Sequence, residues 1–151
     1  PAPGAGGVTG PLGLGPIHHV GYVVADLDAG LAALGRTVPV EVTVREVMEA
    51  QGVEALMAVT AGGGAIELIT PLDPAGAIAR FLASRGEGFH HVAFAVPDVD
   101  AALGALRARG AELVDERARL GLGGHMVGFL HPRSTLGVLT ELVQADHGAS
   151  G

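Results

Sequence analysis

Apolar and polar positions follow the same order twice along the chain. Short runs rich in Val, Ile and Leu predict strands, and apolar positions three to four residues apart predict a helix after the first run of each half. The strands are expected at residues 20–25, 38–44, 53–59 and 65–69, and again at 92–96, 112–116, 126–130 and 138–143. Asp26 and Asp98 occupy the N-cap positions of the two helices, where a carboxylate accepts from unpaired backbone N–H groups. A linking helix is expected at 77–84, between the two halves.

The two halves are also related residue by residue. Residues 17–31, IHHVGYVVADLDAGL, align without gaps with residues 89–103, FHHVAFAVPDVDAAL, and IELI at 66–69 resembles TELV at 140–143. Such self-similarity indicates a duplicated unit. The predicted fold class is α+β: two βαβββ modules, about 17–72 and 89–144, pair into a curled mixed sheet around a central metal cleft.

The working domain is therefore expected to be a single one, at residues 17–144. Residues 1–16, PAPGAGGVTGPLGLGP, contain little that can be buried, and we expect a flexible arm there. Residues 145–151 are similarly expected to form a flexible tail.

Each half carries one His early and one Glu late, which predicts a metal site. His19 and His91 are equivalent in the repeat, as are Glu67 and Glu141. A carboxylate inside a curled sheet loses hydration unless a cation compensates it, and two facing carboxylates repel each other. A divalent ion would solve both problems and leave positions open for water or substrate. A single such His or Glu is more often structural, so the prediction depends on the recurrence.

The remaining histidines are expected to have other roles. His18 and His90 point to the opposite side of their strands from His19 and His91, because side chains alternate along a strand. We expect them to support or pack against the site. His125 and His131 lie near a late strand and its turn, where a structural or substrate-contact role is favoured.

Composition excludes several classes of function. The net charge of −7 argues against binding to nucleic acid or to an anionic membrane. The chain has no Cys and all nine of its Lys and Arg residues are Arg, which excludes thiol nucleophiles, Cys-based zinc sites and lysine Schiff bases. No apolar run is long enough to span a bilayer, and no signal peptide is recognisable. A cytoplasmic location is expected, with weak support from the absence of Cys.

Several segments resemble one enzyme family. They are IHHVGYVVADLD, QGVEALMAV, the stretch from AIELITPLDP through GEGFHHVAFAVPDVD to ARGAEL, and FLHPRSTLGVLTELVQ. Together they resemble the methylmalonyl-CoA epimerase family of the vicinal oxygen chelate superfamily. The likeness extends over nearly all of residues 17–144, and its most specific parts lie at 86–94 and 131–142.

The resemblance implies a fold, a cofactor and a reaction. It implies metal ligands at His19, Glu67, His91 and Glu141, a divalent ion such as cobalt, manganese, nickel or zinc, and a homodimer. It also implies an acyl-CoA substrate. The expected activity is interconversion of (R)- and (S)-methylmalonyl-CoA by proton abstraction through a metal-stabilised enolate. Glu141 is then one of the catalytic groups.

Two further parts of the site are left open by the sequence. Family members with a second acid/base Glu after the QGV segment usually place it where this chain has Ala55, and Glu54 precedes that position. Glu54 is therefore either catalytic or a solvent-facing strand residue, because a shift of one residue turns a side chain to the other face. Arg133, beside Ser134, could contact CoA phosphates or be an ordinary turn residue.

Two other functions compete with the epimerase. A glyoxalase I-like lyase or isomerase acting on a thiol adduct would use the same four ligands. A non-catalytic, ligand-sequestering protein of the bleomycin-resistance type would need no metal, and the four matched positions weigh against it. Ring-cleaving dioxygenases of the superfamily use two His and one Glu, so Glu67 argues against them.

Overall fold

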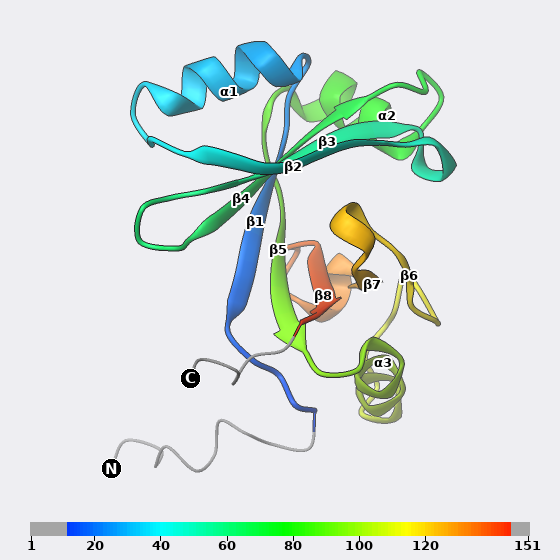
Figure 1. Cartoon of the computed structure of the whole chain (residues 1–151). Coiled ribbons are helices and arrows are strands. Elements are labelled where there is room, and N and C mark those ends of the chain that lie inside the picture. The colour runs from blue at the N-terminus through cyan, green and yellow to red at the C-terminus, as the bar shows by residue number, and fades with distance from the viewer. Residues whose placement is uncertain (1–11, 146–151) are drawn as a thin grey trace. The chain divides into compact units, whose positions relative to one another are not determined.

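The computed structural model describes residues 12–145, which group into two compact units. The first unit comprises residues 19–91 and 121–124, and the second comprises the described residues up to 18, 92–120 and those from 125 onward. Figure 1 shows the order of the elements along the chain. The predicted tail at 145–151, apart from its first residue, and most of the predicted arm at 1–16 lie outside the described residues.

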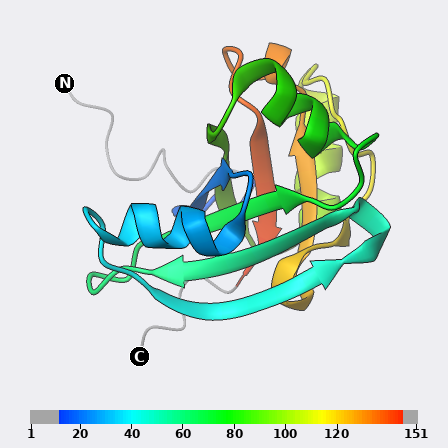
Figure 2. The same ribbon diagram turned by 90° about the horizontal axis from the view of Figure 1, so that it is seen from above.

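The first unit contains a four-stranded mixed sheet with strand order β2-β3-β4-β1. β3 pairs antiparallel with β2 and β4, and β1 pairs parallel with β4. Figure 2 shows β2 and β3 side by side, with α1 next to them. The elements are β1 (Ile17–Val23), α1 (Leu27–Gly35), β2 (Glu41–Met48), β3 (Val53–Val59), β4 (Ala65–Pro71) and α2 (Ala77–Arg85). A short 3₁₀ turn, η2 (Glu49–Gln51), connects β2 to β3.

The two faces of this sheet have different apolar clusters. One face packs against α1, through Leu27 of the helix and Leu56 and Leu68 of the sheet. The other face carries a cluster of Val53, Ala55, Ile69 and Leu122. Leu122 belongs to the 3₁₀ turn η3 (Leu122–Gly124), which is part of the same unit.

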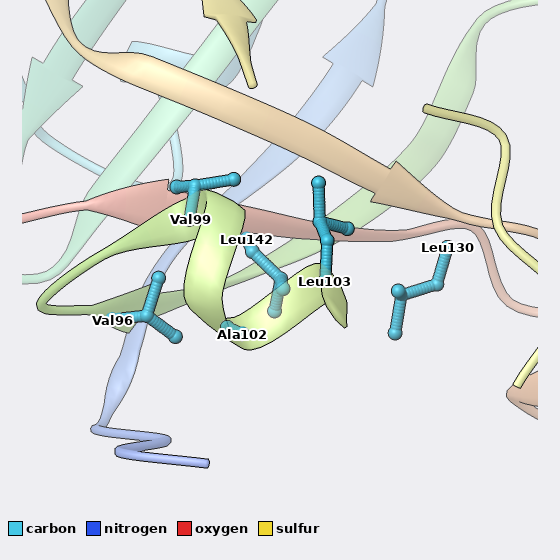
Figure 3. Packing of buried hydrophobic residues seen from close by; sticks show 6 residues of the cluster. All are labelled: Val96, Val99, Ala102, Leu103, Leu130 and Leu142. Carbon is cyan, nitrogen blue, oxygen red and sulfur yellow. The ribbon is translucent and has the colours of Figure 1, made fainter. Parts of the chain in front are cut away.

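The second unit repeats the arrangement with strand order β5-β8-β7-β6. Its helix α3 packs on the sheet through the buried cluster of Figure 3. That cluster contains Val96, Val99, Ala102, Leu103, Leu130 and Leu142. The elements are β5 (Gly88–Val96), α3 (Val99–Ala108), β6 (Arg119–Leu120), β7 (Met126–Leu130), η4 (Pro132–Ser134) and β8 (Thr140–Gln144). β5 begins in the first unit and continues into the second.

The repeated Asp residues begin the two helices as predicted. The Ala29 N–H donates to Asp26 Oδ1 at 2.8 Å, and the Ala101 N–H donates to Asp98 Oδ1 at 3.0 Å. Each bond satisfies one of the free N–H groups in the first helical turn, which favours helix initiation at the same point in both modules.

The predicted fold class is confirmed, and two predicted strands are corrected. The strand expected at 38–44 runs from Glu41 to Met48 instead. Pro39 cannot donate to a strand ladder, so regular pairing begins after it. The structure also shows that Gly15 N–H donates to Ala95 O and that Ala95 N–H donates to Pro16 O, at 2.8 and 3.0 Å. The last residues of the predicted arm are therefore bonded to β5.

The strand expected at 112–116 is replaced by irregular backbone, which meets the ladder at an isolated bridge between Leu113 and Leu130. A few backbone bonds still link this segment to residues 129–131, such as Val114 N–H to Phe129 O at 2.9 Å, and polar side chains supply further bonds. Phe129 N–H donates to Asp115 Oδ2 at 2.9 Å, and Glu112 N–H donates to Ser134 Oγ at 2.7 Å. Such local side-chain acceptors compete with sheet pairing.

Candidate metal centre

Two histidines and one glutamate lie close together in the first unit. His19 is on β1, Glu67 is on β4 and His91 is on β5. Their exposed fractions are 3%, 8% and 1%, so none of these polar side chains is well hydrated. A buried carboxylate beside two imidazoles needs compensation by hydrogen bonds or by a cation.

The strand register explains why these three side chains meet. β1 runs parallel to β4 with Gly21 opposite Glu67, so His19 lies two residues before the partner of Glu67, on the same face. Gly21 provides the space for His91, because a Cβ atom at position 21 would overlap the His91 imidazole ring. A glycine at position 21 of β1 therefore leaves room for the imidazole ring of His91 on β5.

The distances between the donor atoms fit a single ion. His19 Nε2 is 3.2 Å from His91 Nε2, and Glu67 Oε1 is 3.3 Å from His91 Nε2 and 3.9 Å from His19 Nε2. Donors that bind one ion at about 2.1 Å lie about 3.0 Å apart at a right angle and about 3.4 Å apart in a tetrahedral arrangement. The two distances from His91 Nε2 fall in this range and the 3.9 Å distance is wider, so this buried His/Glu cluster could hold a metal ion.

A third histidine lies against the ring of His91. Nδ1 of His90 is 2.8 Å from Nδ1 of His91, and the two ring planes are nearly perpendicular, at 88°. His90 is half-buried, and its ring also contacts Phe81 of α2 at a centroid distance of 5.0 Å. The contact joins the linking helix to the His/Glu cluster through a single imidazole.

Glu141 lies in the second unit, on β8, and is 5% exposed. Its position repeats that of Glu67, because β5 pairs parallel with β8 and places Ala93 opposite Glu141, as β1 places Gly21 opposite Glu67. His91 therefore lies two residues before the partner of Glu141, as His19 does for Glu67. The internal repeat thus holds at the level of strand register as well as sequence.

Comparison with known proteins agrees with this repeated architecture. Residues 18–129 match the model of the Glyoxalase/Bleomycin resistance protein/Dioxygenase superfamily. The mitochondrial methylmalonyl-CoA epimerase of Bos taurus is 35% identical over 144 residues, which cover 95% of this chain and 80% of that protein. The chain belongs to the methylmalonyl-CoA epimerase family.

Two further members of the family show similar agreement. The ethylmalonyl-CoA/methylmalonyl-CoA epimerase of Cereibacter sphaeroides is 34% identical, over 87% of this chain and 98% of that protein. A variant of the Streptomyces coelicolor methylmalonyl-CoA epimerase, solved in complex with 2-nitronate-propionyl-CoA, superposes with a TM-score of 0.81. It is 37% identical, and the match covers 89% of this chain and 99% of that chain. The fold of this family is therefore shared along most of the chain.

Within this family fold, Glu54 does not lie on the sheet face that carries Glu67. β3 pairs Glu54 with Thr70 and Met57 with Glu67, and residues an odd number apart on a strand face opposite sides. Glu54 Oε2 instead lies 3.4 Å from Nε of Arg45. Nη1 of the same arginine lies 2.6 Å from Oδ1 of Asp28, on α1. The structure places Glu54 in an ion-pair network on the helix-covered face.

Arg133 and Ser134 lie in η4, in the second unit. Ser134 Oγ accepts from Glu112 N–H at 2.7 Å and donates to Glu112 O at 3.2 Å, so it joins this turn to the segment after α3. The Arg133 side chain is 76% exposed, and its Nη1 lies 3.6 Å from Oε1 of Glu112.

The remaining histidines have local partners. The His18 ring contacts the His125 ring at a centroid distance of 6.1 Å, and Nδ1 of His125 lies 3.2 Å from Gln144 O. His131 Nδ1 accepts from Arg133 N–H at 3.1 Å, which fixes the start of η4.

One carboxylate on the face of Glu67 was missed by the sequence analysis. Glu46 lies on β2 opposite Ala55 of β3, and Ala55 lies opposite Ile69 of β4. Glu67 pairs with Met57, two residues from Ala55, so both carboxylates belong to one face of the sheet. Alternation along the strand could have indicated this position. The predicted strand ended at residue 44, however, and therefore stopped before Glu46.

The surroundings of Glu46 are mostly apolar. Val44 and Met48 lie two residues to either side of it and pack against the cluster that contains Ala55 and Ile69. The Gly123 N–H donates to Glu46 Oε1 at 2.6 Å, from η3 in the same unit. The half-buried carboxylate is therefore held at one oxygen by a backbone N–H group, and its neighbours on the sheet are mainly apolar.

Proposed function

We propose that this chain is a metal-dependent epimerase that interconverts (R)- and (S)-methylmalonyl-CoA. The observation that carries the proposal is the convergence of His19, Glu67 and His91 at metal-binding distances in a chain of this family. Within residues 12–145, no helix is both long and apolar enough to cross a membrane.

We propose Glu141 as the fourth metal ligand. Its burial and its register equivalence to Glu67 support this assignment. Two imidazoles and two carboxylates suit several first-row divalent ions, and cobalt, manganese, nickel and zinc are the proposed candidates, at one ion per chain. When bound, such an ion supplies Lewis-acid stabilisation to oxygen atoms that become negatively charged during enolate formation.

The chain's own groups would then move the proton. The hydrogen at C2 of a methylmalonyl thioester is acidified by two flanking carbonyl groups, and inversion needs one proton-transfer group on each face of the planar enolate. Glu141 is proposed as one of these groups. Glu54 was the second candidate, but its place opposite Thr70 and its contact with Arg45 support a structural role.

Glu46 replaces Glu54 as the proposed second group. It shares the face of Glu67, at a distance of two strands across the sheet and two residues along it. With strand spacing of about 4.8 Å and a rise of about 3.3 Å per residue, the Cα atoms of the two glutamates lie roughly 12 Å apart. This separation leaves room for a malonyl-sized group between Glu46 and an ion held at Glu67. One group takes the C2 proton while the other, protonated, returns a proton to the opposite face, and the reverse direction exchanges the roles.

The substrate and the assembly complete the proposal. An acyl-CoA substrate is supported by the relatives, which are acyl-CoA epimerases, and by the 2-nitronate-propionyl-CoA bound to a variant of the Streptomyces coelicolor enzyme. Arg133, with its exposed guanidinium, is a proposed contact for the CoA phosphates, with Ser134 holding the turn. A cytoplasmic homodimer is also proposed, and light scattering on the purified protein tests its oligomeric state.

Deuterium exchange at C2 tests the proposed activity. Methylmalonyl-CoA, ethylmalonyl-CoA and propionyl-CoA are incubated in deuterated water with metal-loaded protein, with protein treated with a chelator, and with the Glu141→Gln variant. Removal of the metal should reduce the rate by at least roughly 100-fold. Glu141→Gln should reduce it at least as much, because that variant loses a proposed ligand and a proposed proton-transfer group together.

Single enantiomers test the two proton-transfer groups. Metal-loaded wild type, Glu46→Gln and Glu54→Gln are incubated with (R)- or (S)-methylmalonyl-CoA in deuterated water. We expect Glu46→Gln to lose inversion by about 100- to 10,000-fold while it still exchanges the C2 hydrogen of one enantiomer with retention. Glutamine keeps an oxygen that accepts from Gly123, so full activity of Glu46→Gln would remove Glu46 from the mechanism. If Glu54→Gln exchanged the C2 hydrogen of only one enantiomer, Glu54 would again be the candidate for the second proton-transfer group.

The same samples distinguish the competing activities. A glutathione hemithioacetal is offered as a second substrate under identical conditions. Turnover of that substrate, without C2 exchange of any acyl-CoA, would contradict the epimerase and indicate a glyoxalase I-like reaction. Tight binding of an acyl-CoA without turnover of either substrate would instead indicate a ligand-sequestering protein.

A further inference from the structure

The contact between His90 and His91 brings two nitrogen atoms within hydrogen-bond distance, and only one of them can carry the shared proton. Their Nδ1 atoms are 2.8 Å apart, a distance typical of a hydrogen bond. Each neutral imidazole has one N–H donor and one acceptor nitrogen, so one Nδ1 must carry a proton and the other must accept it. The direction of this bond decides which nitrogen of His91 has a free lone pair.

The other nitrogen of His91 settles the direction once an ion is bound. Nε2 of His91 lies 3.2 Å from His19 Nε2 and 3.3 Å from Glu67 Oε1, so it is the atom that faces the proposed metal position. A nitrogen that binds a metal ion must be unprotonated. The proton of His91 is then on Nδ1, and Nδ1 of His90 is its acceptor.

The hydrogen bond could also run in the opposite direction, from His90 to His91. If His90 donated, His91 would carry its proton on Nε2 and could donate to Glu67 Oε1. That arrangement would satisfy the Glu67 carboxylate without a cation, but it would block one ligand. The direction of the bond at Nδ1 of His91 therefore decides between two tautomers. In one, Nε2 can bind an ion, and in the other, Nε2 donates to Glu67.

The ring of His90 is held by the linking helix. The rings of Phe81 and His90 meet edge to face, with an interplanar angle of 83°, and the guanidinium of Arg85 lies 5.6 Å from the centre of the Phe81 ring. Both of these residues belong to α2. Packing of this kind restricts ring rotation, so the nitrogen of His90 that meets His91 is defined by the fold.

We propose that His90 is a positioning residue that holds His91 as the tautomer with its proton on Nδ1, leaving Nε2 free for a metal ion. The inference rests on the proposed metal centre and adds the residue that sets the tautomer of one of its ligands. Carboxylates and backbone carbonyls usually take this outer role at metal-binding histidines. A neutral imidazole accepts the same proton without adding negative charge beside Glu67.

Two substitutions separate the acceptor from the packing. His90→Phe keeps an aromatic ring against Phe81 and removes the acceptor. His90→Asn places an amide oxygen near the position of Nδ1 and restores an acceptor without the ring. Titration calorimetry with Zn²⁺ should show a loss of about 10- to 100-fold in affinity for His90→Phe, while His90→Asn stays within about 3-fold of the wild type.

Nitrogen-15 NMR of the Zn²⁺-loaded protein gives a readout that does not depend on activity. The His91 Nδ1–H should be visible and protected from solvent exchange in the wild type and in His90→Asn. In His90→Phe it should exchange at least roughly 10-fold faster, because its acceptor is gone. His18→Phe is the matched control, since His18 is equivalent to His90 in the repeat and its ring contacts His125.

Each outcome either supports the assignment or removes it. Unchanged affinity in His90→Phe, equal losses in His90→Phe and His90→Asn, or a His91 proton on Nε2 in the loaded wild type would overturn it. Wild type that binds no Zn²⁺ would overturn the metal centre and this assignment together. Failure of C2 exchange with normal Zn²⁺ binding would instead contradict the proposed epimerase and leave the role of His90 standing.

Discussion

The two modules of this chain agree where they carry the proposed metal ligands and differ in their flanking strands. His19 and Glu67 in the first module occupy the same register as His91 and Glu141 in the second. Each module also begins its helix at an equivalent Asp, with the same N-cap bond. The geometry that positions the donor atoms is therefore the shared part of the repeat.

The flanking strands show the divergence. β2 in the first module has eight residues and pairs along most of its length with β3. The corresponding strand in the second module, β6, has two residues, and irregular backbone occupies the segment before it. Glu46 lies on the long strand. The duplicated core thus carries the proposed metal ligands, and the divergent edge carries the carboxylate proposed for the specific chemistry.

The largest expected effect comes from removing one of the duplicated histidines. His19→Ala and His91→Ala should each weaken binding of a divalent ion by at least roughly 100-fold, because each removes a proposed ligand. Loss of an outer partner alone commonly costs 10- to 100-fold. Isothermal titration with Co²⁺ and metal analysis of the purified protein measure the effect.

The neighbouring histidine provides a matched control for that measurement. His18→Gln changes the adjacent residue on β1, whose ring contacts the ring of His125. Its metal affinity should remain within about 3-fold of wild type. Equal losses in His18→Gln and His19→Ala would show that the disturbance of β1, rather than a lost ligand, weakens binding.

A second comparison concerns the packing of the two repeated helices. Leu31 and Leu103 are equivalent in the repeat, but Leu103 is fully buried and Leu31 is half-buried. Leu103→Ala should lower the free energy of unfolding by about 3 kcal/mol, through lost burial and a residual cavity. Leu31→Ala should cost about half as much. Urea denaturation followed by circular dichroism measures both, and equal costs would contradict the difference in packing.

The smallest expected effect distinguishes another repeated pair, Asp28 and Asp100. The Arg45 side chain, first through its hydrogen bond and then through its charge, lowers the pKa of Asp28 below its ordinary value of 3.8. The resulting stabilisation is present above that ordinary value and disappears as pH falls through the lowered pKa of the folded state. Asp28→Asn should therefore lower stability slightly at pH 6 and no longer do so at a pH below the lowered pKa.

Asp100 provides the matched control for this pair. It has a backbone partner instead, since Ala118 N–H donates to Asp100 Oδ1 at 2.7 Å. Asp100→Asn keeps an oxygen acceptor for that bond, so its urea midpoint at pH 6 should stay close to that of the wild type. An Asp28→Asn deficit that stays the same size throughout the acid range would exclude the ion pair as its cause.

Much of the fold could be predicted because the determining signals are local and occur twice. The strands at 53–59 and 126–130 agree residue for residue with β3 and β7, and Asp26 and Asp98 are the N-caps of α1 and α3. Apolar alternation and capping chemistry act within a few residues, so they can be read from a single chain. The expected set of His and Glu residues likewise came from a recurrence visible in the sequence.

The errors come from interactions that local patterns do not contain. Residues 112–116 look like a strand, but their polar neighbours bind the backbone from other segments, as Asp115 does with Phe129. The face of Glu54, which the sequence left open, depends on its register with Thr70, and only the assembled sheet defines that register. Glu46 was missed because the predicted strand ended at residue 44, whereas β2 continues to Met48.

The missing side chain at Gly21 has a consequence for the history of the repeat. The equivalent residue in the second module is Ala93, whose methyl group is fully buried. A chain assembled from two copies of the second module would carry that methyl at position 21, where it would overlap the His91 ring. The halves are thus no longer interchangeable. One methyl group is enough to make a tandem of two copies of the second module incompatible with the present arrangement of imidazoles.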